Sequence, residues 1–113
     1  MNHGDVYWVE LPDRGGREQR GRRPAIIWQD VSAYPRLPTV LVIPLSSQQD
    51  ALRFGATALV RASADNGLTV DSVALVFQLG ACDVRRIGKP LGKLDAADLE
   101  KIRNIAAKLQ KLA

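Results

Sequence analysis

DVYWVELPDRGGREQRGRRPAIIWQ, residues 5–29, contains two candidate strands joined by a basic loop. Asp5–Leu11 is rich in aromatic and β-branched residues, which predicts a strand. Residues 12–23 combine a proline, three glycines and dense charge, so they cannot bury apolar surface and are expected to form a loop. A loop of about a dozen residues is long for a compact domain, which favours a functional role. Residues 25–29 predict a second, buried strand.

The chain beyond this stretch consists of short apolar runs separated by turn signals such as Asp65-Asn66-Gly67. Pro44 lies near the end of the first run, which suggests that the strand ends at a sheet edge or a bulge. Each run predicts one strand. The runs are residues 39–45, 56–62, 72–79 and 85–87.

The last part of the chain changes to a period of three and four residues, which predicts an amphipathic helix. Asp95 is placed to cap its N-terminus, and Leu94 and Leu99 are placed to form a hydrophobic staple. Five or six short strands followed by one helix predict a mainly β fold, a small and partly open barrel with the helix packed on it. The expected core-facing stripe of the helix is Leu99, Ile102, Ile105, Leu109 and Leu112.

The composition is that of an ordinary soluble domain, with 113 residues, 46% hydrophobic and 25% charged. This length suits one domain, residues 1–113. The chain has no run of about 18 apolar residues and no secretory signal pattern. We therefore expect no membrane span and a cytoplasmic location.

The formal net charge of +4 favours an anionic partner. Its placement is more informative, because residues 14–23 alone carry five arginines and one acid. This segment therefore holds a net charge equal to that of the whole chain. Its arginines are Arg14, Arg17, Arg20, Arg22 and Arg23, and its acid is Glu18.

Several kinds of chemistry are not expected. His3 and Cys82 are the only histidine and the only cysteine, so no zinc-type ligand spacing exists and Cys82 lacks a histidine base. The phosphate-binding patterns GxxxxGK[ST] and GxGxxG are also missing. We therefore expect neither a metal site nor a nucleotide cofactor.

Residues 16–24, GREQRGRRP, follow a G-x-E-Q-x-G-x-R-P pattern and resemble the MazF/PemK family of toxin endoribonucleases. Residues 4–9, GDVYWV, are similar to the opening strand of that family. Residues 38–48 are similar to its P-T-strand-[ST]-[ST]-Q segment. Gly67-Leu68 and residues 73–78 and 91–94 also fit, so the resemblance covers nearly the whole chain.

The resemblance implies an SH3-like small β-barrel of the MazF/PemK/CcdB type that acts as a homodimer. It implies metal-independent, sequence-specific cleavage of single-stranded RNA or mRNA, which leaves 2′,3′-cyclic phosphate and 5′-hydroxyl ends. It also implies neutralisation by a cognate antitoxin, which we expect to carry an acidic tail. The family motifs place the catalytic arginine at Arg23 and the catalytic hydroxyl at Ser46, where many relatives have threonine.

Physical chemistry agrees with these assignments. A planar, permanently charged guanidinium suits the charge that develops on a phosphorane, so Arg23 is expected to bind the transition state. Ser46 is expected to donate a hydrogen bond to a phosphate oxygen. Glu18 either supports catalysis, as an acceptor of the 2′-hydroxyl proton, or pairs with neighbouring arginines. Either Arg23 or water protonates the leaving oxygen.

The remaining candidates are RNA contacts. The arginines either follow RNA phosphates or are ordinary surface charge. The glutamines either read bases or brace loops, and Ser47 belongs with them. Trp8, Trp28 and Phe77 are expected in the core rather than stacked on bases. The RNA-contact candidates are Arg17, Gln19, Arg20, Arg22, Ser47, Gln48, Gln78, Arg85 and Arg86.

Two other functions stay open at this level. A toxin family of the same fold poisons gyrase instead of cutting RNA, although the E-Q-x-G-x-R-P string argues against that reading. The second alternative is a non-catalytic RNA-binding module that keeps the basic loop. The sequence does not reveal the cleavage motif or the antitoxin.

Overall fold

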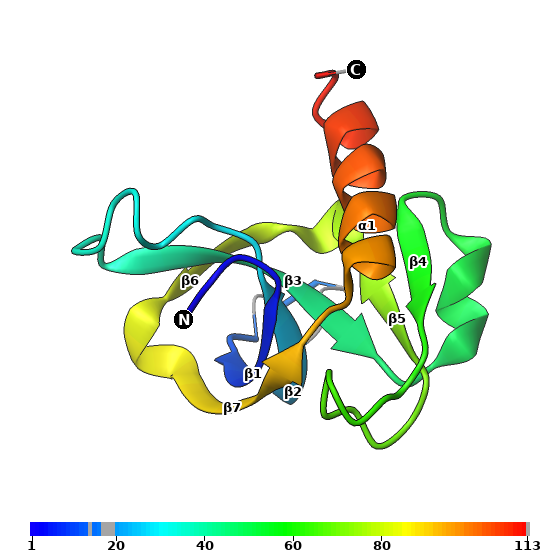
Figure 1. The fold of residues 1–113 in the computed structure, drawn as a ribbon, viewed down its shortest axis with the longest axis horizontal. Helices are drawn as coiled ribbons and strands as arrows, with labels where there is room; N and C mark the ends of the chain where they lie inside the picture. Colours follow the sequence, from blue (N-terminus) through cyan, green and yellow to red (C-terminus); the bar gives the residue numbers. More distant parts are fainter. Residues whose placement is uncertain (14, 17–19, 113) are drawn as a thin grey trace.

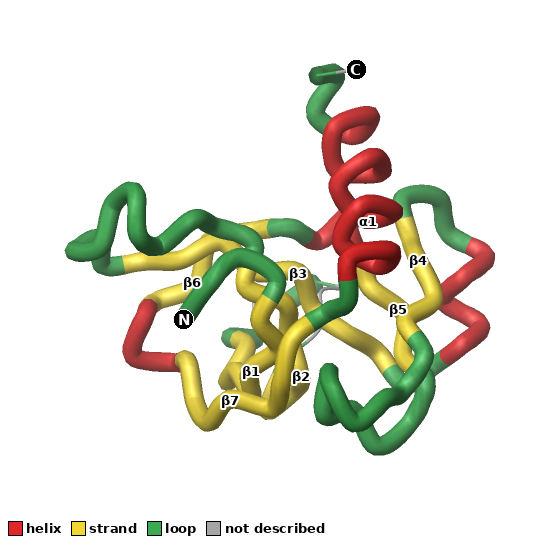
Figure 2. Tube along the Cα trace, in the orientation of Figure 1, coloured by secondary structure: helices red, strands yellow, loops and turns green. Residues whose placement is uncertain are grey.

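The computed structural model of the chain describes residues 1–13, 15–16 and 20–112. Within them, seven strands precede one C-terminal helix (Figure 1), which confirms the predicted mainly β class with a terminal helix. Three short 3₁₀ turns lie between strands (Figure 2). The strands are β1 (Asp5–Leu11), β2 (Gly21–Ile27), β3 (Thr39–Ser46), β4 (Thr57–Val60), β5 (Ser72–Leu75), β6 (Gly80–Asp83) and β7 (Ile87–Lys93). The helix is α1 (Ala96–Leu109), and the turns are η1 (Gln49–Arg53), η2 (Val76–Gln78) and η3 (Val84–Arg86).

All pairings in the sheet are antiparallel, in the order β4-β5-β3-β2-β1-β7, with β6 also paired to β3. β3 is the strand that joins the two parts of the sheet. One of its edges pairs with β2, and the other pairs first with β6 and then with β5. Over the described residues β4 and β7 do not pair with each other, so the sheet is not closed.

The prediction of a sheet edge or a bulge at Pro44 is wrong for the pairing with β2, because Pro44 lies within β3 opposite Ala25 and the register between the two strands does not shift. On its other side, pairing with β6 ends at Val42 and pairing with β5 begins at Leu45. Pro44, which has no backbone N–H, therefore lies where β3 changes its partner from β6 to β5. Neither of these two ladders loses a hydrogen-bond donor.

The strand that follows the basic loop begins earlier than predicted. β2 starts at Gly21, and Arg22 and Arg23 belong to it rather than to the loop. β1 pairs with this segment as far as Leu11 and Gly21. Ladder hydrogen bonds use only backbone groups, so charged side chains can occupy the end of a strand if they point outward.

The predictions for the second half of the chain are partly wrong. The apolar run that starts at Ser72 stays extended only to Leu75 and then forms η2. β6 was not anticipated. The short strand predicted at residues 85–87 is mostly η3, and β7 continues to Lys93 through two glycines and a proline that predicted a break.

Both faces of the sheet are buried. Val6, Ile26 and Ile43 lie on the face covered by α1 and contact Ile102 within one apolar cluster. The opposite face forms a second cluster, whose buried members are Val9, Leu11, Ala25, Ile27, Val40, Val42 and Cys82. Cys82 is therefore a packed core side chain.

The helix begins as predicted. The Asp95 carboxylate accepts a hydrogen bond from the Asp98 backbone N–H at 2.8 Å, which caps the first turn. Leu94 is buried and Leu99 packs beside it. The predicted stripe fails at its end, because α1 extends past the sheet (Figure 1) and Leu109 and Leu112 are exposed.

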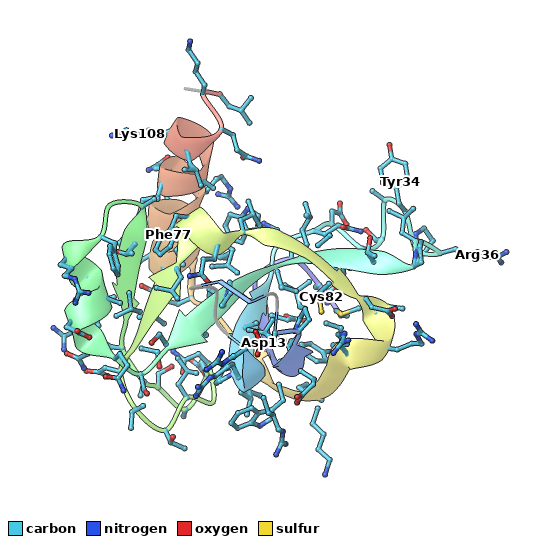
Figure 3. The ribbon with its side chains drawn as sticks, turned by 180° about the vertical axis from the view of Figure 1, so that it is seen from behind. Asp13, Tyr34, Arg36, Phe77, Cys82 and Lys108 are labelled. Atoms are coloured by element: carbon cyan, nitrogen blue, oxygen red, sulfur yellow. The ribbon has the colours of Figure 1, made fainter. Side chains whose placement is uncertain are left out.

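Two of the three large aromatic residues differ from the expectation of core burial. Trp28 packs against the first apolar cluster, as predicted. Phe77 is exposed and makes an edge contact with Phe54, with ring centres 5.7 Å apart. Trp8 lines a surface pocket. The loop between β2 and β3 also carries an exposed aromatic residue, Tyr34, and projects from the sheet (Figure 3).

No helix in the described part of the chain is both long and apolar enough to cross a membrane.

Candidate active site

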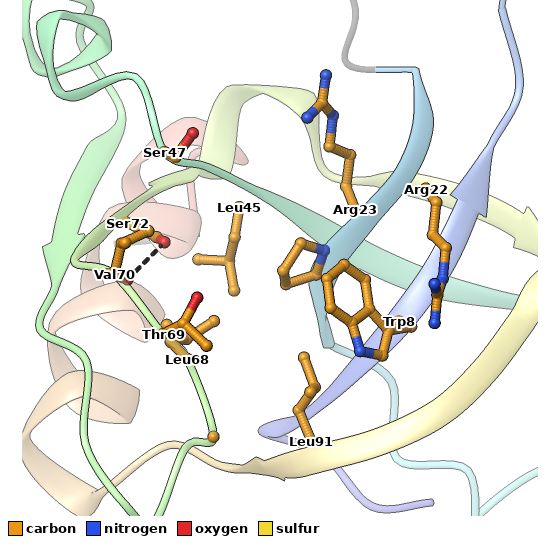
Figure 4. A pocket seen from close by; sticks show the side chains of 12 residues that line it. Trp8, Arg22, Arg23, Leu45, Ser47, Leu68, Thr69, Val70, Ser72 and Leu91 are labelled. Atoms are coloured by element: carbon orange, nitrogen blue, oxygen red, sulfur yellow. Dashed lines mark hydrogen bonds between the residues drawn. The ribbon is translucent and has the colours of Figure 1, made fainter.

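A pocket of about 270 Å³ opens where β2 and β3 face the loop of residues 61–71 (Figure 4). Most of its surface is apolar, and hydroxyl and guanidinium groups lie around it. A concave apolar site with a few polar groups is the usual form of a ligand site. The lining residues are Trp8, Arg22, Arg23, Pro24, Leu45, Ser47, Gly67, Leu68, Thr69, Val70, Ser72 and Leu91.

Strand register gives one wall of the pocket. Trp8 of β1 pairs with Pro24 of β2, so their side chains share one face of the sheet. Arg22 lies two residues before Pro24 and shares that face. Its guanidinium carbon is 4.6 Å from the centre of the Trp8 ring, which is a cation–π contact. This contact holds the indole at the pocket wall and a positive charge beside it.

Arg23 and Ser46 belong to the opposite face. Arg23 precedes Ala25 by two residues and Ser46 follows Pro44 by two, and Ala25 pairs with Pro44. Because side chains alternate along a strand, both lie on the face of that pair. The exposed Arg23 side chain extends from the rim of the pocket away from Leu68 and Leu91 (Figure 4).

Hydrogen bonds hold both side chains. The Arg23 Nε–H donates to the Arg20 carbonyl at 3.2 Å, and no described residue accepts a hydrogen bond from its two terminal nitrogens, which suit a bidentate contact. The Ser46 hydroxyl is buried and accepts from the Gln48 backbone N–H at 3.1 Å. A hydroxyl can accept and donate at the same time, so Ser46 retains its proton for a second partner.

The two neighbouring serines have different environments. Ser46 is 4% exposed and does not line the pocket, whereas Ser47 is exposed and does. In the sequence, only the family pattern distinguishes these two serines. The pocket therefore brings together Arg22, Arg23 and Ser47 of the predicted site residues, while the buried Ser46 lies outside its lining.

The loop of residues 61–71 supplies the far wall, and the sequence analysis missed it as part of the site. Buried Asn66 organises this loop: its side-chain oxygen accepts from the Ser63 and Leu68 N–H groups at 3.0 Å, and its amide donates to the Arg61 carbonyl at 2.8 Å. The Asp71 carboxylate accepts from the Ala62 N–H at 2.8 Å. These bonds fix the backbone that carries the pocket residues.

A pair of glycines joins this loop to β7. A β-carbon on Gly67 would overlap the Leu91 carbonyl, and one on Gly92 would overlap the Asp65 carbonyl. Gly67 also has a φ of +71°, a left-handed conformation that side chains disfavour. The Gly67-Leu68 match and the Asn-Gly turn were the available signals that this segment has a special backbone.

The other predicted residues lie elsewhere or outside the described chain. Arg17, Glu18 and Gln19 are outside the described residues. Arg20 is exposed and pairs with Asp13 at 3.4 Å. Gln48 is exposed just after β3, while Gln78 ends η2 and does not line the pocket.

Arg85 and Arg86 lie on η3, which β1 separates from β2. Val9 of β1 pairs with Arg23 on one side and with Ile87 on the other. Arg85 is bound to Asp83, with Nη2 2.8 Å from Oδ2 and Nε 3.1 Å from Oδ1. These side-chain bonds, together with the Arg85 backbone N–H, lower the pKa of the Asp83 carboxyl from 3.8 to about 2. Much of the Arg85 charge is therefore neutralised within the protein.

The only histidine does not line the pocket. The His3 ring lies 4.3 Å from the Trp28 ring, and burial is the main cause that lowers the pKa of its imidazole. Across the described residues, no three His, Cys, Asp or Glu side chains are grouped as a metal site would require. The groups at the pocket are therefore guanidinium and hydroxyl donors.

Known proteins resemble this chain over nearly its full length. Residues 2–110 match the model of the PemK-like, MazF-like toxin of type II toxin-antitoxin systems. Endoribonuclease MazF of Staphylococcus saprophyticus is 29% identical over 104 residues, which cover 92% of this chain and 86% of that protein.

Solved structures share the fold. MazF from Deinococcus radiodurans superposes with a TM-score of 0.82 at 22% identity, covering 98% of this chain and 96% of that one. A mycobacterial endoribonuclease in complex with its cognate antitoxin gives 0.76 at 18% identity, covering 100% and 97%. With the family model matched from residue 2 to residue 110, the chain belongs to the PemK-like, MazF-like toxins of type II toxin-antitoxin systems.

Proposed function

We propose that this protein is an endoribonuclease toxin that cuts single-stranded RNA, including mRNA in the cytoplasm, at short specific sequences without a metal ion. Family membership supports this proposal, as does the name endoribonuclease on its relative from Staphylococcus saprophyticus. The observation that carries it is the position of Arg23, at the rim of an apolar pocket and on the same sheet face as the Ser46 hydroxyl.

The proposed reaction is a transesterification. The ribose 2′-oxygen attacks the adjacent phosphorus, and the bond from phosphorus to the 5′-oxygen breaks. The products are a 2′,3′-cyclic phosphate and a 5′-hydroxyl. The terminal nitrogens of Arg23 bind the non-bridging oxygens as charge builds on them, while Ser46 donates a hydrogen bond to one of them.

Two proton transfers complete the reaction. The 2′-hydroxyl proton passes to Glu18 or to water, and the leaving 5′-oxygen takes a proton from Arg23 or from water. His3 does not line the pocket, so the imidazole used by many ribonuclease-type sites has no counterpart there. The rate enhancement then depends mostly on electrostatic stabilisation by fixed donors.

Other residues of this proposal bind the RNA. Arg20, Arg22 and Arg86 contact phosphates, and Arg85 contributes less because Asp83 already binds it. Ser47, Gln48 and Gln78 contact bases, and Arg17 and Gln19 extend the surface along the basic loop. These side chains supply the affinity and the sequence preference that Arg23 and Ser46 do not.

The proposal includes two protein partners. The toxin acts as a homodimer, and a cognate antitoxin with an acidic tail neutralises it. The structure of a mycobacterial endoribonuclease with its cognate antitoxin, which shares this fold, supports the second partner. The basic segment that ends at Arg23 is the proposed docking surface for the acidic tail.

Incubation of the purified protein with a labelled single-stranded RNA in EDTA tests the proposal. We expect cleavage with a 2′,3′-cyclic phosphate on the upstream product, identified by mass spectrometry, and no cleavage by the Arg23→Ala variant. Cleavage that requires added divalent metal would contradict the metal-independent mechanism. RNA binding without cutting would indicate a non-catalytic module, and inhibition of gyrase supercoiling would indicate the gyrase-directed alternative.

A further inference from the structure

We infer that the pocket between Trp8 and residues 67–70 holds a single nucleobase of the RNA, next to the cut phosphate, and that Thr69 helps to select that base. This inference rests on the proposed function. It assigns a role to Trp8 and to the loop of residues 61–71, which the catalytic proposal leaves unused.

The size and walls of the pocket suit a flat aromatic ring. Its volume of about 270 Å³ is below the roughly 300–1,000 Å³ of sites for larger ligands. Trp8 supplies one wall, and the stacking of a base on an aromatic side chain contributes roughly ten- to hundredfold in affinity. Arg22 lies on the side of Trp8 away from Leu45 and Leu68 (Figure 4), so it does not fill the pocket.

The position of the pocket limits which base can enter it. Arg23 and Ser47 line the same pocket that Trp8 and Leu68 enclose. The Arg23 side chain starts at the rim and extends outward (Figure 4), so a phosphate on its guanidinium lies outside the pocket and the base of a neighbouring nucleotide can reach the apolar walls. Arg22 adds a second cation for the next phosphate along the strand.

The far wall is rigid, as selection between bases requires. The Asn66 side chain bonds three backbone groups of the loop, and the close approach of Gly67 to Leu91 fixes the loop against β7. A wall that cannot move accepts one shape and rejects others, because rearrangement would break these buried bonds.

On the far wall, Thr69 is the hydroxyl best placed to read a base edge. It lines the pocket and is exposed, and its hydroxyl makes no hydrogen bond with any described residue. The neighbouring Ser72 hydroxyl is buried and donates to the Val70 carbonyl at 3.1 Å. Thr69 can therefore offer both a donor and an acceptor to a base, whereas Ser72 has already used its proton.

Fluorescence tests the stacking. The chain has two tryptophans, so the Trp28→Phe variant leaves Trp8 as the only reporter. The probe is a short RNA that contains the cleaved sequence, with one 2′-deoxy sugar at the cut position so that it is not cut. We expect quenching of Trp8 on binding. An abasic residue next to the cut position is expected to abolish the quenching and to weaken binding roughly ten- to hundredfold, whereas abasic residues elsewhere preserve it.

Sequencing of the cleavage sites tests the selection. Thr69→Val keeps the shape and removes the hydroxyl, and it is expected to change the preference at one position beside the cut by about three- to tenfold. Thr39→Val is the matched control, because Thr39 is an exposed threonine at the far end of β3. Its preferences are expected to equal those of the unmodified protein.

The outcomes separate this inference from the proposed function. The inference alone would be overturned if the protein cuts RNA, if an abasic residue has the same effect on quenching and binding at every position, and if Thr69→Val keeps its cleavage preferences. Base-dependent quenching of Trp8 without cutting would support the pocket and contradict the enzymatic proposal. Quenching by an antitoxin peptide and by no oligonucleotide would overturn the inference by assigning the pocket to the antitoxin.

Discussion

Arg23 and Ser46 lie on one face of the sheet, each two residues beyond the last pair that joins β2 to β3, Ala25 with Pro44. Their backbones are fixed differently. Arg23 pairs with Val9 of β1, and Ser46 pairs with Val73 of β5. β1 therefore holds the backbone of Arg23, and β5 holds the backbone of Ser46. Both residues lie just beyond the end of the β2–β3 ladder.

Substitution of Arg23 tests the geometry of the guanidinium. Both Arg23→Ala and Arg23→Lys are expected to lose most of the cleavage activity, because lysine replaces a planar pair of donors with a point charge. The side chain is exposed, so circular dichroism and thermal unfolding should match those of the unmodified protein. Turnover by Arg23→Lys at the original rate would show that charge alone is sufficient.

Substitution of the two serines separates their roles. Ser46→Ala is expected to lower the cleavage rate by about ten- to a thousandfold, as loss of one transition-state donor does. Ser46→Thr keeps the hydroxyl and is expected to keep activity. Ser47→Ala is expected to alter RNA affinity more than the single-turnover rate. A larger rate loss from Ser47→Ala than from Ser46→Ala would reverse the assignment.

Substitution of the close-packed glycines tests the rigidity of the loop. Gly92→Ala and Gly67→Ala each force a β-carbon against a backbone carbonyl and are expected to destabilise the fold by roughly 1–3 kcal/mol or more. Gly55→Ala is the matched control, since nothing lies within 4 Å of its β-carbon and its φ is not positive. Chemical denaturation of the three variants measures the difference. Equal stabilities would mean that the loop shifts without cost.

The Asp83–Arg85 pair predicts an acid dependence. The pKa of Asp83 is lowered from 3.8 to about 2, so the ionised carboxylate stabilises the folded state. That contribution is present above about pH 4 and is lost as the pH falls through about 2. Arg85→Ala is expected to raise the pKa of Asp83 toward 3.8, which an NMR titration of its carboxyl carbon measures. An unchanged pKa would show that the backbone N–H of residue 85 and the charge of Arg86 cause the shift without the Arg85 side chain.

Competition tests the shared surface proposed for RNA and antitoxin. An acidic tail attracted to the arginines near Arg23 is expected to displace a labelled, uncleavable RNA, as measured by fluorescence anisotropy. Added salt should weaken the antitoxin less steeply than the RNA, because apolar contacts of the tail do not depend on salt. Simultaneous binding of both partners would instead indicate inhibition at a separate site.

Local patterns predicted the parts of the fold that local forces determine. The helix start at Asp95 and the strand Asp5–Leu11 agree with the structure because capping and β-branched content act within a few residues. β7 was missed because its two glycines and its proline oppose an extended strand, and pairing with β1 and contacts with Asp65 and Gly67 stabilise it. Such contacts join residues far apart in the sequence, which no short pattern contains.

The residues of the candidate site also divide into those that a local motif predicts and those that only the fold brings to the pocket. Motif resemblance proposes Arg23 and the serines at positions 46 and 47 as site residues, since each motif lies within a few consecutive residues. The far wall was missed, because Leu68 and Thr69 reach the pocket only through the folding of the loop onto β7. The difference between Ser46 and Ser47 also depends on the fold, because Ser46 is buried at the end of β3 and Ser47, just after the strand, is exposed.

The single thiol lies in the second apolar cluster, where Cys82 of β6 pairs with Val40 of β3. A buried thiol reacts with an alkylating reagent only when its strand opens, so the rate of alkylation counts openings of β6 in the native protein. Because β6 pairs with the first half of β3, from Thr39 to Val42, that rate reports on the sheet beside the strand that carries Ser46. Alkylation of Cys82 thus follows motion in the sheet without an added label.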